Sequence, residues 1–141
     1  EKNGIYYTPQ VSFDEIDIMT DNRQFMAFDI VVAIEVAEHI QDIHGFLTQL
    51  KRFTKRDKKG NVIREHGTEF FLSSPNRNFP KIRKDRPENV FHVREWTSGE
   101  YFNVLSSYFN KVEFFSAAGE PIEDKENTTH TPILARCQSP K

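Results

Sequence analysis

The sequence has 141 residues, of which 37% are hydrophobic and 28% are charged, and its formal net charge is −2 at pH 7. This balance argues against binding to nucleic acid or membranes through overall charge, and every apolar run is too short to span a membrane. The single cysteine, Cys137, excludes an internal disulfide and a cysteine-based metal site. We therefore expect one cytoplasmic domain with a core rich in phenylalanine.

The first half of the chain predicts two strands and one helix. Residues 11–17 (VSFDEID) alternate apolar and polar side chains, which predicts a strand. Residues 28–34 (FDIVVAI) form a nearly continuous β-branched run, which is typical of a strand covered on both faces, as in parallel sheets. Apolar residues at helical spacing then follow Asp42, a good capping residue, and predict a helix over 42–54. The basic, polar stretch 55–67 indicates an insertion.

The second half predicts three strands and one helix. Residues 69–74 (EFFLSS) predict a buried strand that ends before Pro75, and a basic loop follows over 76–89. Further strands are expected over 111–116 and 132–137, separated by a polar loop. Because no helix lies between these last two strands, we expect them to be antiparallel neighbours. The order of elements indicates an α/β layered domain.

The clearest helix start lies at residues 96–102 (WTSGEYF). Thr97 and Glu100 have the spacing of a capping box, and Trp96 is placed to pack onto Tyr101 across the first turn. The buried face of this helix is expected to consist of Phe102, Leu105 and Phe109.

Polar residues follow three predicted strands at their carboxyl ends, where open α/β sheets bind ligands. They are Asp17 after the first strand, Glu35, Glu38 and His39 after the second, and Ser73, Ser74 and Asn76 after the third. His92 precedes the Thr97 helix start and could complete a Glu/His site for Mg²⁺, Mn²⁺ or Zn²⁺. The alternative interpretation is that these are solvated residues at element ends. No GxGxxG motif or P-loop occurs in the sequence.

Three motifs in this order make the chain resemble the second half of class I S-adenosylmethionine-dependent methyltransferases, over about residues 11–137. They are FDIVVAIEVAEHI (28–40), EFFLSSPNRNF (69–79) and NVFHVREWTSGEYF (89–102). Bacterial methyltransferases associated with polysaccharide and glycolipid genes are the most similar type. The resemblance implies a partial Rossmann-like fold that lacks the first βαβ unit and its glycine-rich cofactor loop, and that ends in an antiparallel strand pair. Residues 1–141 would be the C-terminal part of one domain, with 55–67 replacing a short turn of the family.

The same resemblance implies S-adenosylmethionine as the cofactor. Asp17 and Ile18 would lie at the loop that touches the adenine. Ile34, Glu35 and Val36 would line the wall near the methionine part. Because the glycine-rich loop is missing, the cofactor pocket would need the missing N-terminal part of the domain or a partner chain to complete it.

On the acceptor side, the resemblance implies methyl transfer to an oxygen nucleophile of a glycan or small molecule. The loop 76–92 would cover the acceptor. Positioning of the acceptor in line with the methyl group supplies most of the rate enhancement, and a general base removes the acceptor proton where needed. His39 is the first candidate for this base and His92 the second.

A narrower resemblance links the chain to small-RNA 2′-O-methyltransferases, which hold a divalent metal with an E-x-x-E-H motif and a distant histidine. The matching residues are Glu35, Glu38, His39 and His92. RNA phosphates could then be contacted by the basic residues of loop 76–92: Lys81, Arg83, Lys84 and Arg86. A third alternative is a catalytically degenerate methyltransferase fold that acts as a binding or scaffold module, because the glycine-rich loop is missing.

Overall fold

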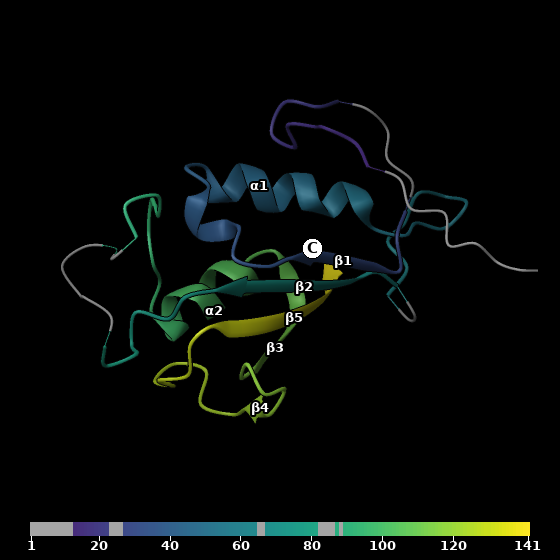
Figure 1. Ribbon diagram of the computed structural model, residues 1–141. Coiled ribbons are helices and arrows are strands. Elements are labelled where there is room, and N and C mark those ends of the chain that lie inside the picture. The colour runs from purple at the N-terminus through teal and green to yellow at the C-terminus, as the bar shows by residue number, and fades with distance from the viewer. Residues whose placement is uncertain (1–12, 23–26, 65–66, 82–86, 88) are drawn as a thin grey trace, which may run out of the picture.

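The computed structural model describes residues 13–22, 27–64, 67–81, 87 and 89–141. Within these residues the chain forms a five-stranded sheet in the order β1-β2-β5-β3-β4. Figure 1 shows α1 running along the β1 side of the sheet and α2 crossing behind β2 and β5. Neither α-helix of the described part has the length and apolar composition that crossing a bilayer requires.

The sheet is mixed. Its elements, in chain order, are β1 Ile30–Ala33, the short 3₁₀ helix η1 Ala37–His39, α1 Ile43–Leu50, the 3₁₀ helix η2 Lys51–Phe53, β2 Glu69–Ser74, α2 Ser98–Ser106, β3 Phe109–Phe115, β4 Pro121–Ile122 and β5 Ile133–Pro140. β1 and β2 are parallel, whereas β2–β5, β5–β3 and β3–β4 are antiparallel. The predicted antiparallel pairing of the last two long strands is therefore confirmed. β4 lies inside the segment that the sequence predicted as a polar loop.

The strand predicted over residues 11–17 is wrong where it can be checked. Residues 13–17 form no strand, and residues 11 and 12 lie outside the described part. Phe13 is 93% exposed, so the alternating pattern has no sheet surface to pack against. The Asp17 carboxylate instead accepts hydrogen bonds from Met19 N and Thr20 Oγ1, which closes a turn over 17–20.

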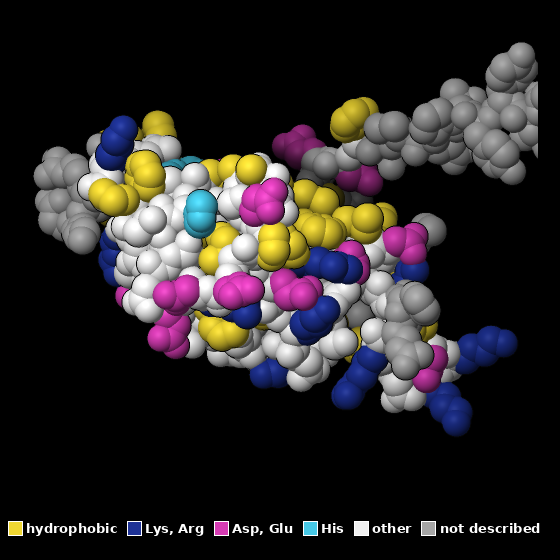
Figure 2. Space-filling view, turned by 90° about the horizontal axis from the view of Figure 1, so that it is seen from below, with side chains coloured by type: hydrophobic (Ala, Val, Ile, Leu, Met, Phe, Trp, Pro, Cys, Tyr) yellow, Lys and Arg dark blue, Asp and Glu magenta, His cyan; other side chains and the backbone are white. Residues whose placement is uncertain are grey.

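In the described part of the chain, β1 lies at the edge of the sheet and one of its faces is exposed, which corrects the expectation that both faces are covered. Among the described residues it pairs only with β2. Ile30 and Val32 are 56% and 60% exposed, and Phe28 and Ile34 are exposed on the same alternation. A β-branched run is typical of strands, but it does not specify which element covers them. Figure 2 shows hydrophobic side chains gathered in a band on part of the surface.

Both predicted helix starts are confirmed by their caps. The Asp42 carboxylate accepts a hydrogen bond from Gly45 N at 2.9 Å, and α1 continues into η2, which ends at Phe53. At α2 the Thr97 side chain and the Glu100 side chain form the reciprocal bonds of a capping box.

The aromatic core follows the predicted pattern except at one position. The rings of Trp96 and Tyr101 pack with centroids 5.5 Å apart, as expected for a hydrophobic staple. Leu105 is buried and Phe102 is partly buried, but Phe109 reaches the core from β3 rather than from α2. The helix ends at Ser106, so Phe109 was wrongly assigned to its buried face.

A carboxylate on β2 gives the fold a predicted pH dependence. Arg136 and Gln138 on β5 donate hydrogen bonds to Glu69, and the bond from Arg136 lowers the pKa of Glu69 below its ordinary value of 4.5. The stabilisation is therefore fully present above that value and is lost as pH falls through the lower folded-state pKa. Because the pair is partly exposed, we expect a contribution of about 0.5 kcal/mol.

Urea unfolding of the protein and of Glu69→Gln measures this contribution. The two free energies of unfolding should differ at about pH 7, and the difference should be smaller at an acid pH, because the stabilisation is lost as pH falls through the lowered pKa of Glu69. An equal difference at both pH values would contradict this interpretation.

Candidate functional site

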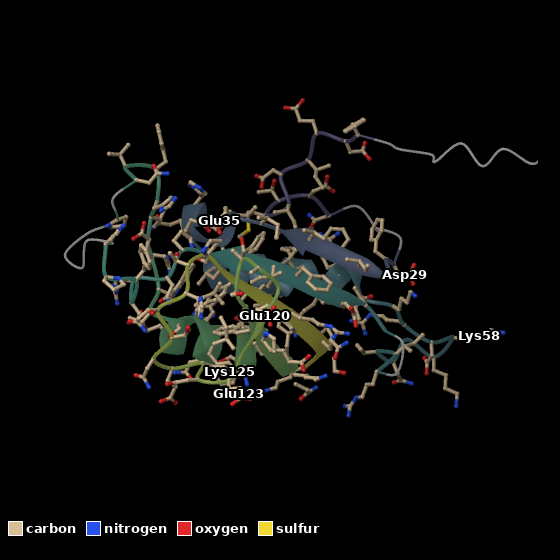
Figure 3. All side chains as sticks on the ribbon, turned by 60° about the horizontal axis from the view of Figure 1, so that its bottom comes forward. Asp29, Glu35, Lys58, Glu120, Glu123 and Lys125 are labelled. Carbon is tan, nitrogen blue, oxygen red and sulfur yellow. The ribbon has the colours of Figure 1, made fainter. Side chains whose placement is uncertain are left out.

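The site lies at the carboxyl ends of β1 and β2, which meet at one edge of the sheet because the two strands are parallel. Glu35 N donates to Ser73 Oγ at 2.9 Å, and Ser73 Oγ donates to Glu35 Oε1 at 2.7 Å. Glu35 has φ of 52°, a left-handed conformation that costs energy for a residue other than glycine. Figure 3 shows Glu35 at the opposite end of β1 from Asp29. The two strand ends are thus joined through a strained residue.

Glu38 is the most unusual group at this edge. Its side chain is 0% exposed, and neither carboxylate oxygen has a hydrogen-bond partner among the described residues. Burial raises the pKa of Glu38 above its ordinary value, since desolvation penalises the charged form. A buried carboxylate without donors is costly unless a positive charge or a donor group compensates it. Glu38 therefore marks a place where a ligand would be stabilised.

Two histidines converge on Glu38. The rings of His39 and His92 form an edge-to-face pair with centroids 4.8 Å apart. One ligand atom from each of Glu38, His39 and His92 lies within 4.8 Å of the others. His39 Nδ1 is 3.0 Å from Phe91 O, and His92 Nδ1 is 2.8 Å from a carboxylate oxygen of Glu95. The structure therefore brings together three of the four residues predicted as metal ligands, and their role as ligands stays a prediction.

Backbone hydrogen bonds hold the second histidine against the first. Val93 N donates to Glu38 O at 2.8 Å, so the residues after His92 are attached directly to η1. Arg77 N donates to Trp96 O at 2.8 Å, which attaches the same segment to the end of β2. The site therefore combines three segments that are distant in sequence.

Other polar residues predicted for this edge have separate partners. The Asn76 side chain is fully buried and donates to Thr128 O and His130 O. Asp17 closes its own turn. Glu35 is outside the three-residue cluster because its carboxylate is bound to Ser73.

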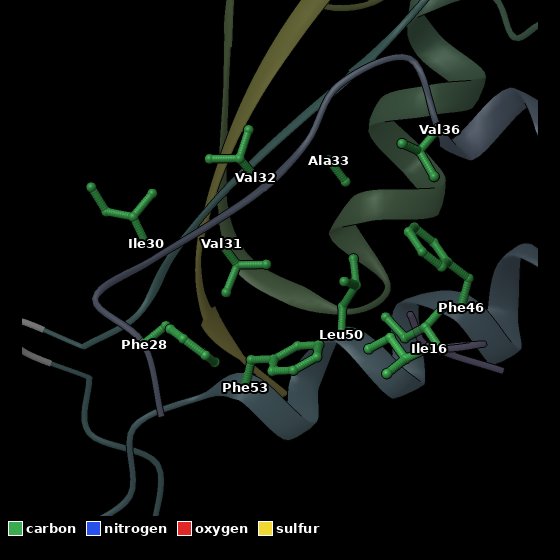
Figure 4. Close-up of a pocket in the computed structure, with 11 residues that line it drawn as sticks. Ile16, Phe28, Ile30, Val31, Val32, Ala33, Val36, Phe46, Leu50 and Phe53 are labelled. Atoms are coloured by element: carbon green, nitrogen blue, oxygen red, sulfur yellow. The ribbon is translucent and has the colours of Figure 1, made fainter. Parts of the chain in front are cut away.

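The residues expected to touch the cofactor separate into two groups. Ile18 and Val36 line an apolar groove of about 430 Å³ beside β1, whereas Asp17, Ile34 and Glu35 do not (Figure 4). Every lining residue is hydrophobic: Ile16, Ile18, Phe28, Ile30, Val31, Val32, Ala33, Val36, Phe46, Leu50 and Phe53. Such a groove has no side chain to bind the ribose hydroxyls or the amino-acid group of S-adenosylmethionine. The side chains of this groove alone therefore do not fit this cofactor.

The first basic segment, the insertion, lies far from Glu35 (Figure 3). In the insertion, the Asp57 carboxylate accepts from Lys59 N and Asn61 N and stabilises a turn from which Lys58 projects (Figure 3). Lys81 in the later loop is exposed. The other predicted phosphate contacts, Arg83, Lys84 and Arg86, lie outside the described residues.

Sequence reasoning missed two residues that contact His92. They are Glu95, which is buried against Nδ1, and Asn89, whose side-chain nitrogen is 3.1 Å from Nε2. The spacing of His92 and Glu95 within one motif was the available signal. It was overlooked because Glu95 precedes the capping box, where an acidic residue has an ordinary explanation.

Comparisons with known proteins found sequence similarity to two kinds of protein. No family model matches the chain. Over 85 residues it is 33% identical to a probable S-adenosylmethionine-dependent methyltransferase of Mycolicibacterium smegmatis, which covers 60% of this chain and 29% of that protein. Over 82 residues it is 27% identical to the H-2 class II histocompatibility antigen gamma chain of Rattus norvegicus, which covers 57% of this chain and 29% of that one.

The structural comparison is the broader one. The crystal structure of the small RNA methyltransferase HEN1 matches 86% of this chain and 15% of that chain, with a TM-score of 0.55 and 19% sequence identity. The chain spans under a third of the length of each relative that it matches. Its mixed α/β fold is therefore similar to part of a methyltransferase structure.

Proposed function

We propose that this chain forms the acceptor side of an S-adenosylmethionine-dependent methyltransferase domain. The observation that carries the proposal is the convergence of Glu38, His39 and His92 beyond the carboxyl ends of β1 and β2. Ligands of open α/β sheets bind at this kind of edge. The sequence similarity to a probable methyltransferase and the fold similarity to HEN1 support the same reaction class.

The bound cofactor would supply the methyl group, and the residues of this chain would position and deprotonate the acceptor. Glu95 favours His92 over His39 as the general base, because a buried carboxylate at Nδ1 orients the ring. An imidazole base suits a hydroxyl acceptor, so we propose an oxygen nucleophile of a glycan or small molecule. Loop 76–92 would lie over that acceptor.

Completion of the cofactor pocket is part of the proposal. The exposed edge of β1 and the apolar groove beside it support the addition of a further polypeptide segment, either an N-terminal part of the domain or a partner chain. That segment would bring the polar groups that the groove lacks. We place the completed protein in the cytoplasm.

Thermal unfolding with S-adenosylhomocysteine tests the reaction class. The melting temperature of the 141-residue chain should stay within about 1 °C, because the groove lacks polar groups for the ligand. A polypeptide or complex in which a further segment completes the pocket should gain several degrees at saturating ligand.

Two results would change the assignment. A clear shift for the 141 residues alone would contradict the need for completion. If the completed polypeptide or complex folds cooperatively but shows no shift, the degenerate binding or scaffold module becomes the better description.

A second candidate function is metal-dependent 2′-O-methylation of RNA, favoured by the uncompensated Glu38 carboxylate beside two imidazoles. This donor set fits Mn²⁺ or Zn²⁺ better than Mg²⁺, which prefers oxygen ligands. Glu38, His39 and His92 would hold the ion, with Glu35 as a fourth ligand if it left Ser73. The metal would act as a Lewis acid on ribose hydroxyls. Calorimetric titration of Mn²⁺ into the protein is the direct test, and absence of binding at millimolar metal would exclude this function.

A further inference from the structure

His92 lies between two side chains, and the donor and the acceptor in each hydrogen bond can be deduced. Phe91 N donates to Asn89 Oδ1 at 3.0 Å, and a backbone N–H can only donate. The oxygen of the Asn89 amide therefore faces Phe91, and its NH₂ group faces His92 Nε2 at 3.1 Å. Because that group is a donor, Nε2 must be the acceptor. The ring proton of the neutral imidazole then lies on Nδ1, which donates to Glu95 at 2.8 Å.

We infer that Glu95 is a positioning residue that fixes the Nδ1–H tautomer of His92, and that the Asn89 amide occupies Nε2 until a divalent cation displaces it. This inference rests on the second candidate function for its ligand. Glu95 is 7% exposed and its other carboxylate oxygen has no partner among the described residues. The pair therefore resembles the carboxylate–histidine arrangement that orients metal-binding imidazoles.

The two contacts have opposite effects on cation binding. Glu95 accepts the hydrogen bond from Nδ1–H, so this bond persists when Nε2, the nitrogen without a proton in this tautomer, coordinates a cation. Asn89 contacts the coordinating nitrogen, so its hydrogen bond must break first. Removal of Glu95 should weaken binding, whereas removal of the Asn89 amide should strengthen it.

The first experiment measures the tautomer in the metal-free protein by ¹⁵N NMR of the imidazole at about pH 8.5, where a typical histidine is neutral. The wild-type protein should show the proton on Nδ1. Glu95→Gln keeps an acceptor oxygen and should retain this tautomer. The Asn89 amide alone also favours a proton on Nδ1, so the role of Glu95 is measured in proteins that lack this amide. Asn89→Ala should keep the proton on Nδ1, whereas in Asn89→Ala/Glu95→Met, which has no acceptor oxygen at Nδ1, the proton should distribute over both nitrogens. The same tautomer in both folded variants would overturn the positioning role of Glu95.

The second experiment titrates Mn²⁺ calorimetrically into the single variants of Glu95. Glu95→Met should lose about 10- to 100-fold in affinity, as outer partners of metal ligands usually do, and Glu95→Gln should lose less. Glu113→Met is the control, because it removes a carboxylate on β3 that pairs with Lys111 and Arg136. Its Mn²⁺ affinity should equal that of the wild type. Equal losses in Glu113→Met and Glu95→Met would contradict a specific role for Glu95.

Asn89→Ala tests the displacement step. Its Mn²⁺ affinity should rise about five-fold, the equivalent of one hydrogen bond that no longer has to break. A fall in affinity would overturn this part of the inference. If the wild-type protein binds no Mn²⁺, the metal-dependent function fails, while the NMR result in metal-free protein still decides the role of Glu95.

Discussion

Replacing His92 with alanine is expected to weaken Mn²⁺ binding by about 100-fold, as measured by isothermal titration calorimetry. One ring nitrogen of His92 lies within 4.8 Å of a ligand atom of Glu38 and of one of His39. Loss of the imidazole therefore removes one of three convergent donors. Loss of an outer partner alone typically costs 10- to 100-fold, which places a direct ligand at the upper end of that range. His39→Ala and Glu38→Gln should have effects of the same size.

Two further variants sharpen this test. His44→Ala is the matched control, because His44 is an exposed histidine on α1 whose Nδ1 contacts Tyr108 Oη at 2.9 Å. It should bind Mn²⁺ as the wild type does. Glu35→Gln distinguishes a site with three ligands from a site with four. A loss of about 10-fold in Mn²⁺ affinity would indicate that Glu35 leaves Ser73 to coordinate the ion. Wild-type affinity in His92→Ala would eliminate the proposed metal site.

Replacing Asn76 with alanine is expected to lower the free energy of unfolding by about 3 kcal/mol. The buried amide donates to Thr128 O at 2.7 Å and to His130 O at 2.9 Å, and its oxygen accepts from Asn78 N at 3.0 Å. Alanine would leave these backbone groups without their partner and would create a small cavity, and both effects are costly in a buried position. Urea unfolding followed by circular dichroism measures the change.

Asn110→Ala provides the control for the Asn76 result. Asn110 is an exposed residue on β3 whose side chain makes one hydrogen bond, to Ser139 O at 2.9 Å. We expect a loss of about 0.5 kcal/mol, which is typical of surface substitutions. Comparable losses in both variants would show that the Asn76 amide contributes no more than an ordinary surface contact.

Much of the local structure could be predicted because its determinants lie within a few residues. β2 has the predicted bounds, and the caps at Asp42 and Thr97 form as expected. The exposure of β1 could not be predicted in this way, because burial depends on what packs against a strand rather than on the strand itself. The strand expected over 11–17 was wrong for the same reason: its alternation has no described sheet neighbour.

The candidate site was predictable to the extent that topology determines it. Parallel pairing of β1 with β2 brings their carboxyl ends together, and this rule placed Glu38 and His39 correctly near one edge. The partner of each side chain depends on contacts across long stretches of sequence. Ser73 and Asn76 both lie at the carboxyl end of β2, but Ser73 binds Glu35 whereas the Asn76 side chain points into the interior.

The open edge of β1 also affects how the isolated chain would behave at high concentration. An unpaired strand with exposed apolar side chains is a surface for edge-to-edge association. The opposite edge is less suited to such pairing, because β4 has only two residues and β3 carries Lys111 and Glu113 beside it. Because the described residues form one open edge of this kind, self-association through it would end at pairs and would not propagate into fibres. The asymmetry between the two sheet edges therefore limits how far unintended assembly can proceed.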